Sequence, residues 1–286
     1  MRELDEAEWR ARRAAHEARV AVWVTPAAER ARHGEPHPVE DFLFTYYSFR
    51  RSALRRWSPG LGVVLRGADR RDLAREFVAV DGGAQLCDPP ERVRATAAVI
   101  AELLARTAGR PASFACFGLH EWAMVHGQSQ EQVRHAAYPL RLGPERTTAL
   151  VEELPVRCSH YDAFRFFPES ARPLNAVQPT RATQADLEQP GCLHATMDLY
   201  KWAYKLAPWV PAELVADCFD LARRVRELDM RAAPYDLSRL GYRPVRIETS
   251  AGRAEYAAAQ RRFAEEAAPL RERLRTAAAL VAARAS

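Results

Sequence analysis

Stretches rich in alanine, glutamate and arginine constrain the fold of this 286-residue chain more than any other feature of its sequence. Residues 4–33 and 251–284 have this composition, and residues 90–108 open in a Pro-Pro-Glu run and stop before Gly109. Proline at the start and glycine just past the end are typical of a helix. We therefore predict a mainly helical fold with helical arms at both termini.

Shorter segments with regular hydrophobic spacing complete this prediction. Further helices are expected at residues 38–56, 117–127, 144–154, 184–206 and 211–231. Strand candidates are few and short, at residues 62–66, 77–80, 156–167 and 244–248. The balance predicts an α+β protein, mainly α with a small β-sheet. Because no irregular stretch is long or polar enough to be a flexible linker, we expect a single domain over residues 1–286, with a site-bearing core at 114–206.

Composition narrows the class of protein. Hydrophobic residues make up 48% and charged residues 28% of the chain, which fits a soluble globular protein. No apolar run approaches the roughly 18 residues of a membrane span, and the charged start has no signal-peptide core. The five cysteines are odd in number and form no Cys-x-x-Cys pair, which favours reduced thiols. We expect a cytoplasmic protein without a membrane partner, and the sequence leaves its oligomeric state open.

The charge balance permits contact with polyanions without requiring it. The formal net charge is +5 and the pI is about 9.1. Much of the arginine alternates with glutamate along the predicted helices, which is typical of a solvated surface. A denser basic patch at residues 50–57 could attract phosphate groups without sequence specificity.

Lysine is almost absent, and its two occurrences lie close together. Of 42 basic residues only Lys201 and Lys205 are lysines. Lysine offers an amine that can lose its proton, whereas arginine stays charged and planar. On a helix these two residues share one face with His194 and Asp198. Two interpretations remain: a surface ladder of ion pairs, or one wall of a polar pocket in which the carboxylate tunes the amine.

A second polar segment, residues 116–126, begins like a zinc-protease helix but departs from that motif. His120 is followed by Glu121, yet the next histidine, His126, comes six residues later instead of four. At helical spacing the two rings are then about 240° apart. A zinc-protease site of the His-Glu-x-x-His type is excluded, although His120 and Glu121 remain candidates as single metal ligands or acid–base groups.

A third segment follows at residues 156–167. If it is a strand, alternation places Cys158, His160 and Asp162 on one face and Arg165 on the other. A nearby carboxylate can orient a histidine, and the Cys-x-His-x-Asp spacing also suits metal ligation. The alternative is a buried histidine with a polar neighbour, but three polar groups on one strand face are costly to bury without partners.

Long motifs of the chain resemble those of a known group of proteins. They lie at residues 39–47, 116–124, 158–167, 188–194 and 197–206. Over nearly its whole length the chain resembles actinobacterial proteins named 3-methyladenine DNA glycosylase or glycosylase-like. The resemblance implies hydrolysis of the N-glycosidic bond of an alkylated purine, in DNA or in a nucleoside-like small molecule, without a cofactor.

Such an enzyme needs a carboxylate for the oxocarbenium ion and a pocket that stacks the base. The lysine amine would also allow a Schiff base at the sugar. Asn175, the only asparagine, could read the edge of a base, although it also suits a turn. The candidates for catalysis are Lys201, Asp198, Asp162, His160 and Glu121. The candidates for substrate binding are Arg165, Asn175, Arg181, Tyr200, Tyr204, Trp122 and Lys205.

Two other functions stay open at the level of the sequence. One is a metal-dependent enzyme that acts on a small polar or anionic substrate. Its divalent ion would be held by ligands drawn from His120, Glu121, His160, Asp162 and His194. The other is a non-enzymatic helical protein that binds nucleic acid through its arginine surface, which predicts an affinity that falls steeply with salt.

Overall fold

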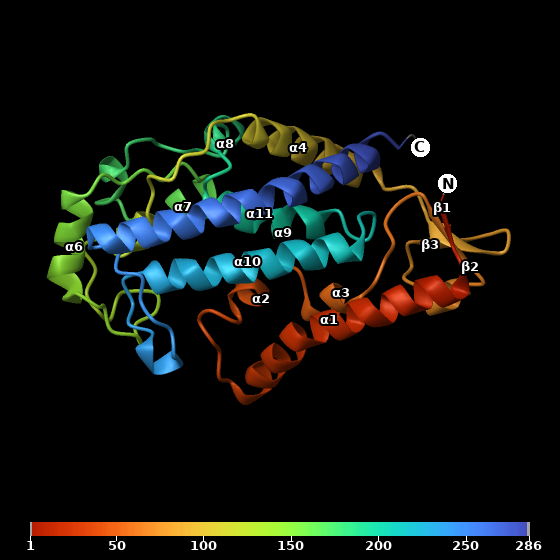
Figure 1. Ribbon diagram of the computed structural model, residues 1–286, viewed down its shortest axis with the longest axis horizontal. Coiled ribbons are helices and arrows are strands. Elements are labelled where there is room, and N and C mark those ends of the chain that lie inside the picture. The colour runs from red at the N-terminus through yellow and green to blue at the C-terminus, as the bar shows by residue number, and fades with distance from the viewer. Residues whose placement is uncertain (1, 285–286) are drawn as a thin grey trace. The chain divides into compact units, whose positions relative to one another are not determined.

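The computed structural model describes residues 2–284 and confirms a mainly helical fold with a small sheet (Figure 1). The helices are α1 (Glu6–His33), α2 (Phe42–Tyr46), α3 (Arg51–Arg55), α4 (Glu91–Ala108), α5 (Leu119–Ala123), α6 (Gly143–Glu153), α7 (Tyr161–Phe164), α8 (Gln184–Leu187), α9 (Leu193–Lys205), α10 (Ala212–Ala232) and α11 (Ser250–Ala282). The strands are β1 (Arg2–Leu4), β2 (Val63–Arg66), β3 (Phe77–Val80) and β4 (Gly83–Leu86). Across residues 2–284, none of the helices has both the length and the apolar character to cross a membrane.

The chain divides into two compact units. The first contains Met1–Ala105, Asp198–Ala222 and Pro269–Ser286, and the second contains Arg106–Met197 and Arg223–Ala268. Helices α4, α9, α10 and α11 contribute residues to both units. The expected single domain stays a prediction.

The sheet belongs to the first unit and has the strand order β1-β2-β4-β3. Strand β1 runs parallel to β2, and β4 runs antiparallel to both β2 and β3. Strands β3 and β4 form a hairpin around Asp81 and Gly82, and Gly82 has a φ of 68°. Two-residue Asp-Gly turns favour such hairpins because glycine adopts positive φ without strain. This turn explains β4, which the sequence analysis missed.

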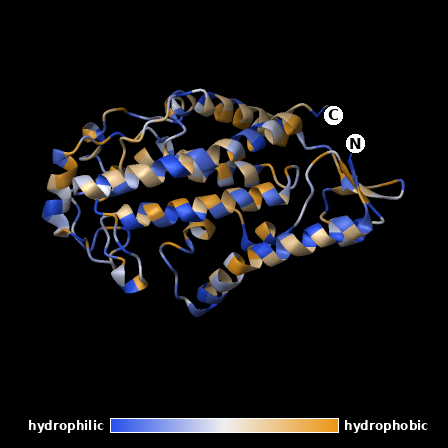
Figure 2. Cartoon of the chain, in the orientation of Figure 1, coloured by the Kyte–Doolittle hydropathy of each residue, from blue (hydrophilic) through white to orange (hydrophobic). Residues whose placement is uncertain are grey.

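Helix α1 is specified at both ends and along one face. The side chain of Asp5 accepts a hydrogen bond from the backbone N–H of Glu8, and Gly34 closes the helix with a φ of 70°. Hydrophilic and hydrophobic residues alternate along the helix in short blocks (Figure 2). Its buried side chains recur every three to seven residues, at Trp9, His16, Val20, Val24 and Ala27. This spacing places one stripe toward the interior of the unit.

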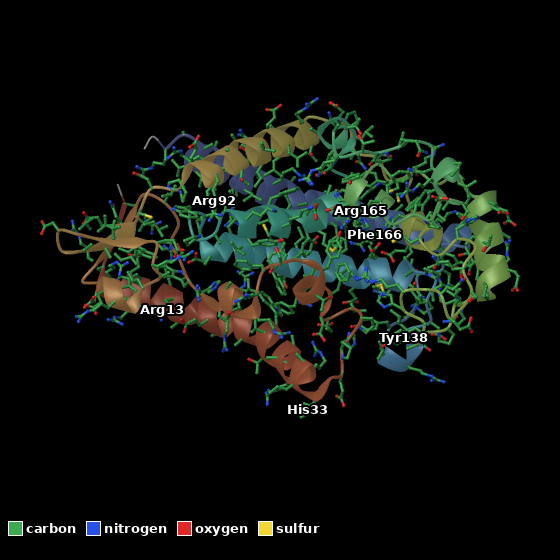
Figure 3. All side chains as sticks on the ribbon, turned by 180° about the vertical axis from the view of Figure 1, so that it is seen from behind. Arg13, His33, Arg92, Tyr138, Arg165 and Phe166 are labelled. Atoms are coloured by element: carbon green, nitrogen blue, oxygen red, sulfur yellow. The ribbon has the colours of Figure 1, made fainter. Side chains whose placement is uncertain are left out.

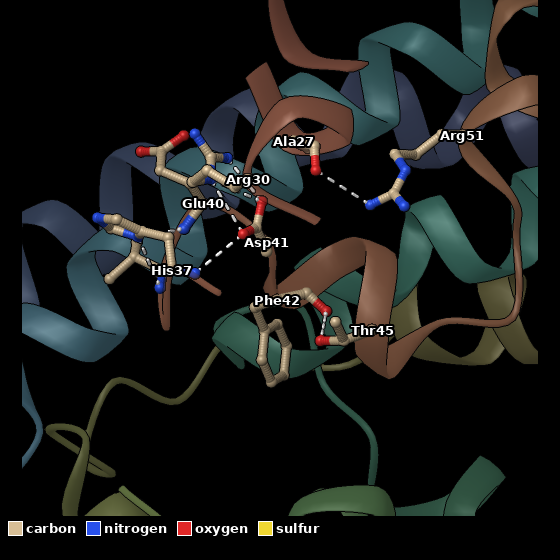
Figure 4. A network of polar contacts seen from close by, with 9 residues as sticks. Ala27, Arg30, His37, Glu40, Asp41, Phe42, Thr45 and Arg51 are labelled. Carbon is tan, nitrogen blue, oxygen red and sulfur yellow. Dashed lines mark hydrogen bonds and ion pairs between the residues drawn. The ribbon is translucent and has the colours of Figure 1, made fainter. Parts of the chain in front are cut away.

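The loop after α1 is held by a bidentate ion pair between Arg30 and Asp41 (Figure 4). The closest contact, Nη2 to Oδ1, is 2.6 Å, and the backbone N–H of His37 donates to Oδ2 at 2.9 Å. Burial opposes ionisation of Asp41, but the hydrogen bonds from Arg30 and His37 outweigh it and lower the pKa of this carboxyl. The loop is therefore tied to the end of α1 by a carboxylate that must stay ionised.

Asp41→Asn is expected to lower the free energy of unfolding by about 2 kcal/mol at neutral pH, because hydrogen bonds to a charged group are lost. The folded-state pKa lies below the unfolded value of about 3.9, so this stability is present above that pH and is lost as the pH falls through the folded pKa. Urea unfolding at several pH values measures it. The matched control is Glu17→Gln, which removes an exposed pair with Arg13 and should cost less than about 0.5 kcal/mol. Equal losses in the two variants would contradict the prediction.

The expected strand at residues 156–167 is wrong. Only Val156 pairs, in an isolated bridge with Asn175, and the chain then turns into α7. The side chain of Asn175 accepts from the N–H of Cys158 and donates to its carbonyl. Because an amide side chain already satisfies the backbone of Cys158, no neighbouring strand is needed there.

Other boundaries also differ from the sequence predictions. The expected helix 184–206 is broken between α8 and α9, where Pro190 lacks an N–H and Gly191 packs closely: a Cβ on Gly191 would lie 2.5 Å from the carbonyl oxygen of Ser113. The expected strand 244–248 is absent from the described chain, because Val245 bonds to the carbonyl of Arg231 and forms no ladder. The helices expected at 38–56 and 117–127 are present only as short turns of helix.

Candidate functional site

Four titratable side chains of the second unit converge on one point. They are His120 and Glu121 from α5, His194 from the first turn of α9, and Asp229 from α10. Each offers one ligand atom, and these four atoms all lie within 4.8 Å of one another. His194 is half-buried and the other three are buried. The segments are far apart in the chain, since 109 residues separate His120 from Asp229. We call these four residues the ligand cluster.

Both ring nitrogens of His120 are engaged. Nε2 lies 3.0 Å from Oδ1 of Asp229, and Nδ1 lies 3.2 Å from Sγ of Cys116. The ring of His194 meets that of His120 edge to face, with centroids 4.5 Å apart. These two contacts fix the orientation of the ring. If an ion took the place of the contact between Nε2 and Asp229, Cys116 would still hold Nδ1, as a protein group holds the second nitrogen of most metal-bound histidines.

The carboxylates of the cluster are buried beside a single guanidinium. Nη1 of Arg226 lies 3.4 Å from Oε1 of Glu121 and 3.5 Å from Oδ2 of Asp229. Burial and the charge of Asp229 raise the pKa of Glu121. Burial opposes ionisation of Asp229, but the charges of His120 and Arg226 lower its pKa. Burial alone would lower the pKa of His120, whereas Asp229 raises it well above the usual value. The cluster thus stabilises added positive charge.

One carboxylate oxygen of the cluster is poorly satisfied. Oδ2 of Asp229 is buried, it has no hydrogen bond of ordinary length from the described residues, and its cationic neighbour is Nη1 of Arg226 at 3.5 Å. A buried carboxylate oxygen without a hydrogen bond is unfavourable by about 1–3 kcal/mol. The contact with Arg226 is too long to offset this fully, so the donor set fits a cation at this position.

The backbone that carries His120 is strained. Phe117 has a φ of 48°, and it is the one non-glycine residue in the described chain with a positive φ. Gly118 follows with a φ of 75°, and a Cβ there would approach the ring of Tyr256 to 3.1 Å. Left-handed backbone at a bulky residue costs of the order of 1–3 kcal/mol and is common at functional sites. The strain lies between Cys116 and His120.

A loop contact places the start of α9 against the segment that precedes α5. The side chain of Gln189 accepts from the N–H of Ser113 at 2.8 Å and donates to its carbonyl at 3.1 Å. Gly191, which follows, permits the close approach of the two backbones. The Gln-Pro-Gly sequence therefore fixes the position from which α9 projects His194.

A small pocket lies beside the cluster. It has a volume of about 90 Å³ and lies within the second unit. Both histidines of the cluster line it, while Glu121 and Asp229 are not among the lining residues. The other lining residues are Ser113, Cys116, Arg157, Cys158, Ser159, Gln189, Cys192, Leu193, Tyr256 and Gln260. The pocket thus reaches the cluster on the side of its two histidines.

Of the five metal ligands expected from the sequence, three lie in the ligand cluster. His160 stacks on His194, with ring centroids 5.3 Å apart, but is not one of the four convergent donors. Its Nε2 lies 3.8 Å from Oε2 of Glu188. Asp162, in α7, instead pairs with Arg165 at 3.1 Å. The guanidinium of Arg165 lies 4.4 Å from the ring centroid of the exposed Phe166, and Figure 3 labels both residues.

Three residues expected to bind substrate do not line the pocket beside the ligand cluster. Trp122 is buried, and its indole N–H donates to the carbonyl of Ala232, which anchors α5. Asn175 is buried and binds the backbone of Cys158 and Val177. Arg181 is exposed in the segment before α8.

The remaining candidates on α9 belong to the first unit. Asp198 is buried, with Oδ1 2.9 Å from the hydroxyl of Tyr47 and Oδ2 2.8 Å from Nζ of Lys201. Tyr200 and Tyr204 are buried rings in edge-to-face contact. Lys205 is exposed. The stripe along α9 therefore contains an ion pair between the half-buried Lys201 and the buried Asp198. The catalytic roles expected for these residues stay predictions.

Asp229 was not among the candidates, because the sequence predicted residues 211–231 only as a helix and assigned no site to it. A signal was present: Arg226 and Asp229 fall among buried positions of that helix such as Val225 and Leu228. Charged side chains on an apolar helix face are costly unless they are paired or bind a cation.

Comparisons of the chain with known protein families, curated proteins and solved structures give no match.

Proposed function

We propose that the protein is a divalent-metal-dependent hydrolase that acts on a small polar or anionic molecule. The ligand cluster would hold the ion, and the adjoining pocket would hold the reacting part of the substrate. The single observation that carries the proposal is the convergence of four donor atoms from three distant segments within 4.8 Å of one another. Such a set of two imidazoles and two carboxylates suits zinc, manganese or iron in the divalent state.

The cluster also has the electrostatics of a cation site. Two buried carboxylates share one guanidinium, and the contact of that guanidinium with Oδ2 of Asp229 is long, at 3.5 Å. The Nδ1 atom of His120 lies 3.2 Å from the thiol sulfur of Cys116, and this contact fixes the ring. A bound divalent ion would supply an activated water, whose pKa such ions lower to about 7.

Two side chains that line the pocket favour a small anionic ligand that also carries a hydrogen-bond donor. Arg157 lines it and is exposed, so its guanidinium can meet an anionic group. Gln260 is buried and donates through Nε2 to the carbonyl of Gly191 at 2.6 Å, which fixes the orientation of its amide. Its Oε1 then accepts no hydrogen bond from residues 2–284 and is available to a substrate N–H or O–H.

Elemental analysis of the untagged full chain tests the proposal. The expected result is about one divalent transition-metal ion per chain, retained through dialysis and removed by a chelator. Hydrolysis of small esters, amides and nucleosides is then screened in the purified, stripped and reloaded protein. A content below about a tenth of an ion per chain, with no rebinding of Zn²⁺ or Mn²⁺, would overturn the proposal.

The same preparations test whether the protein has the N-glycosidic activity implied by the sequence resemblance, and whether that activity needs the metal. Alkylated duplex DNA is incubated with stripped and reloaded protein, and released bases are measured. Base release that is unchanged after metal removal would favour the N-glycosidic activity at residues other than the ligand cluster. Base release that requires the ion would identify the alkylated base as a substrate of the metal site.

A further inference from the structure

The first unit contains a cavity whose walls are mainly apolar. Its volume is about 140 Å³, and its walls include Phe49, Ala53, Leu54, Trp57, Val210 and Val215 together with the polar residues Arg56, Ser58 and Glu76. Apolar cavities of about 150 Å³ admit a benzene ring. The size and lining therefore suit a single six-membered ring.

One wall of this cavity is held rigidly. The indole N–H of Trp57 donates to Oε1 of Glu213 at 2.8 Å, and the guanidinium of Arg12 lies 5.5 Å from the indole ring centroid. Arg12 itself binds Glu213 at 2.8 Å. Because these contacts fix the ring of Trp57, the cavity is preformed and a ligand would lose little affinity to reorganisation.

An open groove lined by arginines adjoins the cavity. Arg13, Arg55, Arg56 and Arg75 line the groove, and Arg56, Trp57, Ala74 and Glu76 line both the groove and the cavity. The shared residues place the groove beside the cavity, with Arg56 at their junction. Arg13 projects from α1 in this part of the first unit (Figure 3).

Two of the groove arginines are not neutralised by a carboxylate. Arg13 pairs with Glu17 and Arg75 pairs with Glu76, each at 3.0 Å. Arg55 and Arg56 are both exposed, and neither has an ion-pair partner among the side chains that the structure describes. A phosphate monoester carries a charge of about −1.5 to −2 at neutral pH, which matches two unpaired guanidinium groups.

From these observations we propose that the first unit binds a small phosphate monoester whose organic part is a single ring. The ring would occupy the cavity beside Trp57, and the phosphate would lie against Arg55 and Arg56. This site is independent of the metal proposal, because no ligand-cluster residue lines the cavity or the groove. It gives the protein a second ligand, recognised by its anionic group and its ring together.

Calorimetric titration with phenyl phosphate tests the site. Inorganic phosphate and phenol, which represent the anionic part and the ring of this ligand, are titrated separately for comparison. Phenyl phosphate is expected to bind at least about tenfold more tightly than either half, because both parts contribute. Its affinity should fall as salt is raised, since the guanidinium groups are exposed. Binding no tighter than that of inorganic phosphate would overturn the proposal.

Two variants separate the two parts of the site. Arg56→Gln should weaken phenyl phosphate at least about tenfold. Ala53→Phe should fill the cavity and weaken phenyl phosphate similarly, while inorganic phosphate binds as before. Arg50→Gln is the matched control, because Arg50 is exposed in the same segment but lines neither cavity nor groove.

The variants also decide between this site and the metal site. Arg56 is exposed, so its variant tests the proposal even if Ala53→Phe is destabilised. Unchanged binding of phenyl phosphate by Arg56→Gln would overturn the proposal. Equal binding by metal-stripped and metal-loaded wild type is expected, whereas binding that disappears with the metal would assign phenyl phosphate to the ligand cluster instead.

Discussion

His194→Ala is expected to leave the protein folded and to lower its metal content from about one ion to below about a tenth of an ion per chain. The side chain is half-buried and contributes one of the four convergent donor atoms. Losing one ligand of four removes a bond and opens the site to water. Any hydrolytic activity found in the wild type should fall at least about a thousandfold, because the activated water depends on the ion.

The matched control is His126→Ala in the same unit. His126 is buried and contacts Ser170 at 2.9 Å and Glu152 at 3.3 Å, but it is not part of the ligand cluster. This variant should lose stability while keeping its metal. Elemental analysis and circular dichroism of both variants give the comparison. Full metal content in His194→Ala would remove this residue from the site.

Lys201→Met is expected to lower the free energy of unfolding by about 3 kcal/mol, with metal content unchanged. Lys201 donates to Asp198 at 2.8 Å, and Asp198 is only 2% exposed. Removing one partner of a fully buried pair typically costs about 3–5 kcal/mol because the other charge is left poorly compensated, and here Lys201 is only half-buried. Tyr47 still donates to the same carboxylate, so the lower end of this range is expected.

The second lysine of the chain supplies the control. Lys205 is exposed at the last turn of α9, and Lys205→Met should change stability by less than about 0.5 kcal/mol. Urea unfolding of the two variants makes the comparison. If both lysines can be replaced at equal cost, the ion pair with Asp198 is not what stabilises the first unit.

Some of the segments in which the chain resembles the glycosylase-named proteins contribute residues to the pocket beside the ligand cluster. Cys116 and His120 come from one such segment, Cys158 from a second, and Cys192 and His194 from a third, and all five line the pocket. Asp229 lies outside every one of these segments. These segments therefore supply residues of the pocket but not every residue of the ligand cluster.

Local signals were reliable where a single segment determines its own conformation. Helix α1 begins after the capping residue Asp5 and ends at Gly34, and both residue types are local signals for a helix end. The strand expected at 156–167 failed because Asn175, from a later loop, satisfies the backbone of Cys158. No spacing within the segment carries that information.

The sequence by itself determined that the fold is mainly helical, and it identified His120, Glu121 and His194 as candidate ligands. It did so because caps, periodicity and rare polar residues act over a few positions along the chain. Only the tertiary structure added Asp229 to these three and assigned Lys201 to an ion pair with the buried Asp198. The physical reason is that a ligand set and the burial of an ion pair depend on distances between segments, and neighbouring residues do not fix those distances.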